Sequence, residues 1–132
     1  MTLAASPDPL AVLTAAQQRV FDDYHQADSA IAVISCALVA RLVRAAHPEA
    51  RTLPLRAQHR AMAHTGWWIG PRGAELPLVA DYDAIDRELS HLDVGNHAAW
   101  EPLCERNLVT GAYAMRMHEA LRAADQYLSG SA

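Results

Sequence analysis

The sequence predicts an α+β fold, and three patterns support this prediction. Apolar residues recur every three or four positions near the N-terminus, and a nearly continuous apolar run follows them. Residues 52–80 then change to the alternation of strands, and helical spacing returns after them. Because helices and strands are segregated along the chain, an α+β domain is favoured over alternating β-α units. We expect an N-terminal helical hairpin, a short antiparallel three-stranded meander and two to three C-terminal helices.

The first helix of the hairpin is predicted from Pro9 to about His25. Asp8 can accept hydrogen bonds from the free amides of the first turn, and Pro9 suits the first helical position because its missing N–H is not needed there. Apolar residues at helical spacing then predict one buried face. This face is expected to contain Leu10, Leu13, Ala16, Val20 and Tyr24.

The second helix is centred on the apolar run Ala30–Val43. The run is too long for an ordinary strand, and its charged flanks leave it too short to cross a membrane. Asp28 or Ser29 could cap it and so complete a hairpin; if neither does, one helix runs from Pro9 to His47. We favour the hairpin, because a single rod would leave two apolar faces with nothing to fold back on. A helix that is apolar on most sides is either central to the fold or a contact between two copies.

The central part of the chain predicts an antiparallel meander. Its strands are expected at Thr52–Ala57, Thr65–Ile69 and Ala74–Ala80, and the residues 70–73 between the last two form a turn with two glycines and a proline. Pro54 lacks a backbone donor, which favours an edge position or a strand start for the first of them.

The C-terminal part predicts helices again. Asp83 is expected to cap a third helix that ends at Gly95, and Trp100 lies in a short turn after it. The last helix is expected from Thr110 to Leu128, because apolar residues recur there at helical spacing.

Composition limits the classes of function. With 132 residues the chain is expected to form one globular domain, residues 1–132. The formal charge of −4 argues against a nucleic-acid-binding protein, which needs a dense basic surface. All eleven basic residues are arginines, which is typical of GC-rich bacterial genomes and excludes a catalytic lysine. Cys36 and Cys104 form no CxxC pair, and no secretory signal is apparent, so we expect a protein of the bacterial cytoplasm with two inert thiols.

Few residues suggest catalysis. The chain contains no G-x-S-x-G elbow and no phosphate-binding loop, so we expect neither a catalytic site nor a cofactor. The best candidate for a metal site is His91, Asp93 and His97, which a turn at Gly95 could bring together. The alternative interpretation places these histidines at helix ends facing solvent. A small metal-dependent enzyme or metalloprotein therefore remains the second hypothesis.

Two adjacent tryptophans suggest a binding surface. Successive strand residues point to opposite faces, so one of Trp67 and Trp68 should enter the core while the other faces outward near Arg72. Exposed tryptophan and arginine are typical of binding hot spots, unless a helix also covers that face. We therefore expect a small non-enzymatic binding or regulatory protein, for example an immunity-type or mobile-element partner protein. We expect a protein partner, with homodimerisation through the Ala30–Val43 helix as a possibility, and neither nucleic acid nor membrane as a partner.

Overall fold

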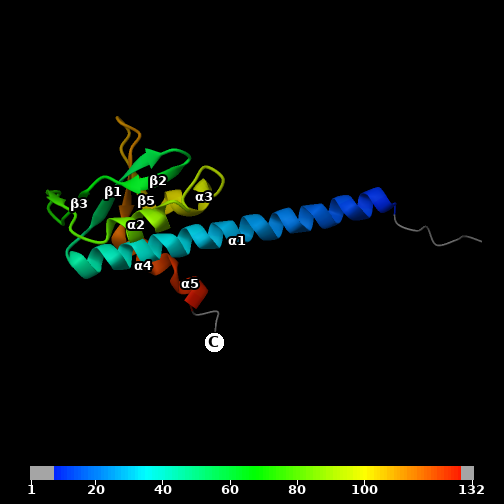
Figure 1. Cartoon of the computed structure of the whole chain (residues 1–132), viewed down its shortest axis with the longest axis horizontal. Helices are drawn as coiled ribbons and strands as arrows, with labels where there is room; N and C mark the ends of the chain where they lie inside the picture. The colour runs from blue at the N-terminus through cyan, green and yellow to red at the C-terminus, as the bar shows by residue number, and fades with distance from the viewer. Residues whose placement is uncertain (1–7, 129–132) are drawn as a thin grey trace, which may run out of the picture.

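The computed structural model describes residues 8–128 and confirms the α+β class. One long helix packs by its C-terminal half against a body made of a six-stranded antiparallel sheet and several short helices, and its N-terminal half projects from that body (Figure 1). The helices are α1 (Pro9–Ala46), α2 (Tyr82–Leu89), α3 (His97–Trp100), a 3-10 turn (Glu101–Leu103), α4 (Met117–Ala123) and α5 (Asp125–Leu128). The strands are β1 (Thr52–Gln58), β2 (Ala61–His64), β3 (Trp67–Ile69), β4 (Glu75–Pro77), β5 (Cys104–Arg106) and β6 (Tyr113–Arg116).

The predicted N-terminal hairpin is wrong, because α1 is one uninterrupted helix of 38 residues. It starts as expected: Asp8 is the cap, and its carboxylate accepts a 3.1 Å hydrogen bond from the backbone amide of Leu10. Asp28 does not cap a second helix, since its carboxylate instead accepts a 3.3 Å hydrogen bond from the side-chain amide of Asn96. No glycine or proline follows Pro9 inside the helix, so the good helix formers continue it to the predicted end at His47.

The sheet is organised around β1, which is a central strand. The order is β4-β3-β1-β6-β5, and β2 pairs with the far end of β1 on the same side as β3. Every pairing is antiparallel. Pro54 lies inside this central strand, opposite Ala114 of β6, so its assignment to an edge or to a strand start was wrong. The predicted meander therefore covers only part of a larger sheet.

The predicted helix from Thr110 to Leu128 is also wrong in its first part. Strands β5 and β6 form a hairpin there, and α4 begins only at Met117. The turn has a local cause: the side-chain oxygen of Asn107 accepts hydrogen bonds from the amides of Val109 and Thr110, and Gly111 adopts a positive φ of 74°. This turn chemistry overrides the helical spacing of the apolar residues around it.

Helix α2 forms close to the predicted position but is shorter. Asp81, not Asp83, is its cap, and its carboxylate accepts a 3.1 Å hydrogen bond from the amide of Ala84. The helix ends at Leu89 rather than continuing to Gly95. Its inner face is formed by Ile85 and Leu89, which are fully buried.

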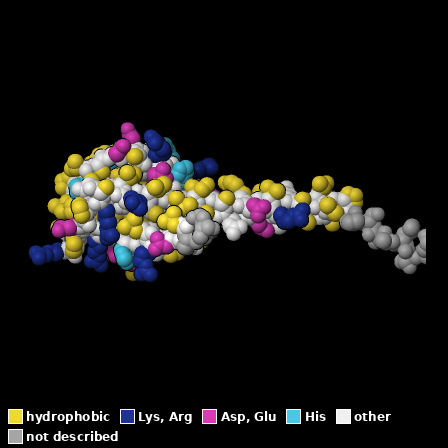
Figure 2. All heavy atoms as spheres, turned by 90° about the horizontal axis from the view of Figure 1, so that it is seen from below, with side chains coloured by type: hydrophobic (Ala, Val, Ile, Leu, Met, Phe, Trp, Pro, Cys, Tyr) yellow, Lys and Arg dark blue, Asp and Glu magenta, His cyan; other side chains and the backbone are white. Residues whose placement is uncertain are grey.

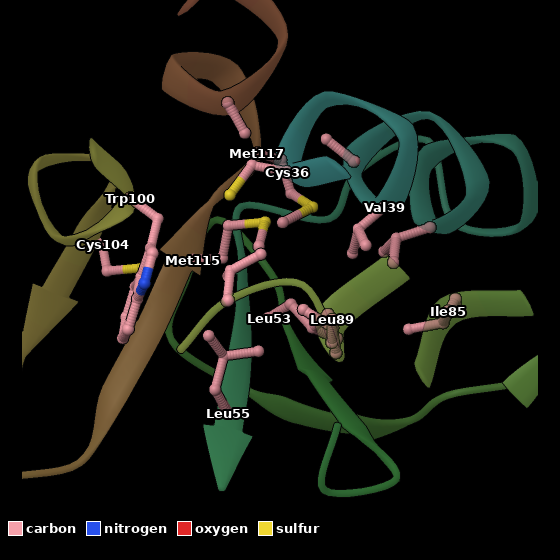
Figure 3. Close-up of a cluster of buried hydrophobic side chains, with 14 of the residues drawn as sticks. Cys36, Val39, Leu53, Leu55, Ile85, Leu89, Trp100, Cys104, Met115 and Met117 are labelled. Atoms are coloured by element: carbon pink, nitrogen blue, oxygen red, sulfur yellow. The ribbon is translucent and has the colours of Figure 1, made fainter. Parts of the chain in front are cut away.

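The hydrophobic core lies between the C-terminal half of α1 and one face of the sheet. Cys36 and Val39 of α1 face Leu53 of β1 and Met115 of β6, and Leu89 of α2 closes one side (Figure 3). Helix α1 also packs against α4, α2 and α3. The core therefore holds only the second half of α1 in place. Because the helix is unbroken, this packing also sets the direction in which its first half projects from the body.

Candidate functional site

The N-terminal half of α1 makes the most unusual surface of the molecule. From Pro9 to Ala27 every residue is exposed except the half-buried Ala16, and full burial begins only at Ala32 (Figures 1 and 2). The residues predicted to form a buried face are instead in solvent. Leu10, Leu13, Val20 and Tyr24 are 70%, 68%, 67% and 62% exposed. Their helical spacing was correctly recognised, but the body does not cover them.

The exposed apolar residues continue in a regular pattern along the whole helix. Their spacing alternates between three and four residues, as at the a and d positions of a coiled coil. We call this set the stripe: Leu10, Leu13, Gln17, Val20, Tyr24, Ala27, Ile31, Ile34 and Leu38. All nine side chains are exposed, and Gln17 is the single polar one among them. The stripe therefore extends over four consecutive heptads with the apolar period of a coiled coil.

The stripe and the core occupy opposite faces of α1. In the second half of the helix, Ile31, Ile34 and Leu38 are exposed, whereas Cys36 and Val39 are completely buried. A period of 3.6 residues places these two sets about half a turn apart. The Ala30–Val43 segment, predicted as a central helix or a dimer contact, thus uses one face for the core and keeps the other for solvent.

The projecting half of α1 has a polar side as well. Gln18 donates a 2.9 Å hydrogen bond to the carboxylate of Asp22 one turn later, and both residues lie opposite the stripe. Arg19 and Asp23 add charges to the same segment. The projecting rod is thus amphipathic rather than apolar all round.

Length and composition alone would allow α1 to cross a membrane. It is the one helix within residues 8–128 that passes this test, and its most apolar 18-residue window has a mean hydropathy of 1.8. However, 44% of that window is buried inside the body, and one such helix is only weak evidence for a membrane span. The projecting half carries Arg19, Asp22 and Asp23 within five residues, and charges of this density are costly in lipid.

The two adjacent tryptophans alternate as predicted. Trp68 is 7% exposed, belongs to the core and donates a 3.1 Å hydrogen bond from its indole N–H to the carbonyl of Pro77, whereas Trp67 is 45% exposed. Arg72 lies in the turn after β3, at the opposite end of that strand from Trp67. Arg72 instead shares a shallow surface hollow with the rim of Trp68 and with Leu76. The predicted binding surface is therefore split between two places, and its role stays a prediction.

The weaker metal hypothesis finds no support in the geometry. Within residues 8–128 no group of three or more His, Cys, Asp or Glu side chains is placed to hold an ion. The carboxylate of Asp93 accepts a hydrogen bond from the backbone amide of Asn96, so it stabilises the turn at residues 93–96. His97 is held instead between Glu101 at 3.0 Å and the hydroxyl of Tyr113 at 2.9 Å. His91 contributes its backbone carbonyl, which accepts a hydrogen bond from the Asn96 side chain.

The contacts of His97 form a chain of polar groups that the sequence did not suggest. Its ring lies edge-on to Trp100 and Tyr113, beside a mostly apolar cavity of about 270 Å³ that Met62 and Leu92 also line. A carboxylate, an imidazole and a phenol in series can relay a proton. Their positions along the chain, on a short helix and on a distant strand, gave no signal of this arrangement.

Neither cysteine is suited to nucleophilic chemistry. Burial raises the pKa of the Cys36 thiol far above its ordinary value, and the nearby Cys104 raises it further. Burial also raises the pKa of Cys104 to about 12, an effect that Arg116 partly offsets and Glu101 reinforces. Both thiols therefore stay protonated at neutral pH, whereas a cysteine acts as a nucleophile only as the thiolate.

No protein-family model, curated protein or solved structure matches the chain. The fold and the stripe define it as an α+β protein with a projecting amphipathic helix. Among the surfaces described above, the stripe has the most regular pattern.

Proposed function

We propose that this chain is a non-enzymatic protein-interaction module, in which the body holds out helix α1 so that its stripe can bind a helix of a protein partner. The observation that carries the proposal is the continuous exposure of Leu10, Leu13, Val20 and Tyr24 on the half of α1 that the described part of the body does not cover. Helices in proteins gain most of their stability from packing an apolar face. A rod of this kind therefore gains stability when its stripe is covered.

The energies favour a partner as well. Burying one large apolar side chain fully is worth roughly 1.5–3 kcal/mol. Seven large apolar residues of the stripe are between about 40% and 70% exposed. Covering them would release on the order of 5–10 kcal/mol on this chain alone, before the partner's side is counted. This is comparable with the 4–15 kcal/mol that association costs, so a matching apolar partner can bind stably.

A photo-crosslinking experiment in living cells tests this proposal. A photoreactive amino acid replaces Tyr24 on the stripe in one variant and Asp22 on the opposite side in a control variant. We expect ultraviolet light to join position 24 to a defined protein segment, either of another protein or of a second copy, and to leave position 22 largely unreacted. Mass spectrometry of the crosslinked peptides identifies the segment. Equal labelling at the two positions, or none at either, would contradict the proposal.

The finer proposal is a small regulatory or immunity-type partner protein of the bacterial cytoplasm. Its support comes from the sequence: a net charge of −4, basic residues that are all arginines, and no catalytic motif. The exposed Trp67 offers a second, smaller surface for such a partner. For any regulatory or immunity-type partner protein that binds through the stripe, replacing stripe residues should abolish partner binding while the body stays folded.

A further inference from the structure

We propose that the stripe of α1 binds the same stripe of a second copy of this chain, so that two α1 helices form a coiled coil and the protein is a homodimer. This proposal rests on the proposed function, because it identifies the partner of the stripe as a second copy of the chain. Every molecule carries both halves of such an interface, since a heptad stripe packs against another stripe with the same period. A second copy therefore satisfies the spacing without any further assumption.

The dimensions of the stripe meet the needs of a stable dimer. From Leu10 to Leu38 it is about 42 Å long at 1.5 Å per residue. A cylinder of that length and a diameter of about 11 Å has a side area of roughly 1,450 Å². If each helix buries about a third of that area, the two together bury about 1,000 Å², which is the lower bound for a specific biological interface.

The position of the body leaves room for the second helix. The core contacts come from Cys36, Val39 and their neighbours on one face, while Ile31, Ile34 and Leu38 continue the stripe on the other. A partner helix therefore meets exposed stripe residues along the length of α1, and the projecting half, whose neighbouring positions are also exposed, offers the wider contact. Figure 2 shows hydrophobic side chains that continue from the body onto the rod.

The polar residues favour a protein helix over a lipid surface. Gln17 occupies an a position, where a single polar residue commonly sets the register of a coiled coil and where lipid would leave its amide without partners. The projecting half also carries Asp22 and Asp23 against one Arg19. This excess of negative charge opposes binding to anionic membranes.

Sedimentation equilibrium of the full chain tests the inference directly. We expect a mass near 29 kDa, about twice the 14.4 kDa of one chain, in the micromolar range and dissociation on dilution. Val20→Glu should raise the dissociation constant roughly a hundredfold or more, because it places an unpaired charge at the buried d position of each helix.

Val12→Glu is the matched control. Val12 and Val20 are both exposed valines of the projecting half, at 48% and 67%, but only Val20 belongs to the stripe. Val12→Glu should leave the dissociation constant within about threefold of the wild-type value, an energy difference below 1 kcal/mol. All three tryptophans lie in the body, so an unchanged fluorescence spectrum verifies that the body stays folded, and an unchanged helical circular dichroism signal verifies the same for α1.

The possible outcomes separate this inference from the proposed function. A wild-type chain that stays monomeric up to millimolar concentration overturns the homodimer, and so does an assembly of three or more chains, or equal dissociation by Val12→Glu and Val20→Glu. If the monomer still forms crosslinks from position 24 to a different protein, the proposed function survives without the homodimer. A monomer that binds phosphatidylcholine vesicles with or without phosphatidylserine, and forms no protein crosslinks, overturns both.

Discussion

His64 and Asp86 are joined twice through one carboxylate oxygen. Oδ1 of Asp86 accepts a 2.9 Å hydrogen bond from the backbone N–H of His64 and lies 2.6 Å from Nδ1 of the same residue. The His64 side chain is buried and packs against the ring of Tyr82. This pair ties the short edge strand β2 to helix α2, and so holds one side of the sheet against the helices.

Asp86→Ala should destabilise the fold by about 2–3 kcal/mol, because it leaves a buried backbone donor and a buried imidazole without their partner. Urea unfolding followed by tryptophan fluorescence measures the loss. Asp83→Ala in the same helix is the control, since Asp83 is exposed in the first turn and its loss should cost about 0.3–1 kcal/mol. Similar losses for the two variants would show that the shared oxygen contributes little.

Trp68→Ala should cost about 3–5 kcal/mol, because it removes a core side chain that also stacks on His47 with ring centroids 4.7 Å apart. Trp67→Ala should cost clearly less than Trp68→Ala, since 45% of Trp67 is already exposed to solvent. Chemical denaturation of the two variants compares these values. If Trp67 is a partner contact, its variant keeps its stability and loses affinity; if both variants only lose stability, the sheet-face hypothesis fails.

The stability of the fold should decrease between pH 9 and pH 12 because of its buried thiols. The pKa of Cys104 is about 12 in the folded chain, against an ordinary value of 9.0, so the unfolded chain loses this proton first. Above about pH 9 the folded state then binds more protons than the unfolded state, and its stability falls by up to about 1.4 kcal/mol per pH unit for this thiol. Below pH 9 the same group adds no pH dependence.

Urea unfolding at successive pH values measures this slope, and Cys104→Ala provides the comparison. The variant should be less stable at pH 7, because it leaves a small cavity, but should lose stability less steeply above pH 9. An identical slope in the two proteins would mean that Cys104 does not cause the decrease.

Ala40→Leu should destabilise the fold by about 1–3 kcal/mol. Ala40 is fully buried on the core face of α1, where the helix packs closely against the body, and a larger side chain would force the packed layers apart. Ala45→Leu, at an exposed position near the end of the same helix, should stay within about 0.5 kcal/mol of the wild type. Thermal unfolding compares the two. Equal stability of the two variants would contradict close packing at Ala40.

Much of the fold could be predicted from local signals. The start of α1 at Asp8 and Pro9 and the strand predicted at Thr52–Ala57, which extends to Gln58, depend on nearby residues, and the structure confirms both. The α+β class follows from the same patterns. In each case the determining chemistry lies within one or two turns of helix or one strand.

The errors have causes that lie far away in the sequence. Asp28 was a candidate cap for a second helix. In the structure its carboxylate instead accepts a hydrogen bond from Asn96, which is 68 residues away. Tyr113 and Met117 are spaced as on one helix face, yet they belong to a strand and to the start of a helix. The turn at Asn107 and Gly111 decides this, and its signal was outweighed by the apolar spacing.

The candidate site was predicted only in part. The helical spacing of Leu10, Leu13, Val20 and Tyr24 was visible, but such spacing does not say whether the face meets the same chain or a partner. The continuation through Ile31, Ile34 and Leu38 becomes apparent only when the helix is unbroken. A predicted hairpin conceals the heptads because it assigns the two halves to different helices.

The unbroken helix also separates the surfaces of the molecule. The residues before Asp28 extend about 28 Å from the body at 1.5 Å per residue, and strand β3 with its exposed Trp67 lies at the end of the body opposite the rod (Figure 1). A ligand on that strand and a helix bound to the projecting half would therefore not collide. The two proposed binding surfaces are thus kept apart by one unbroken helix of 38 residues.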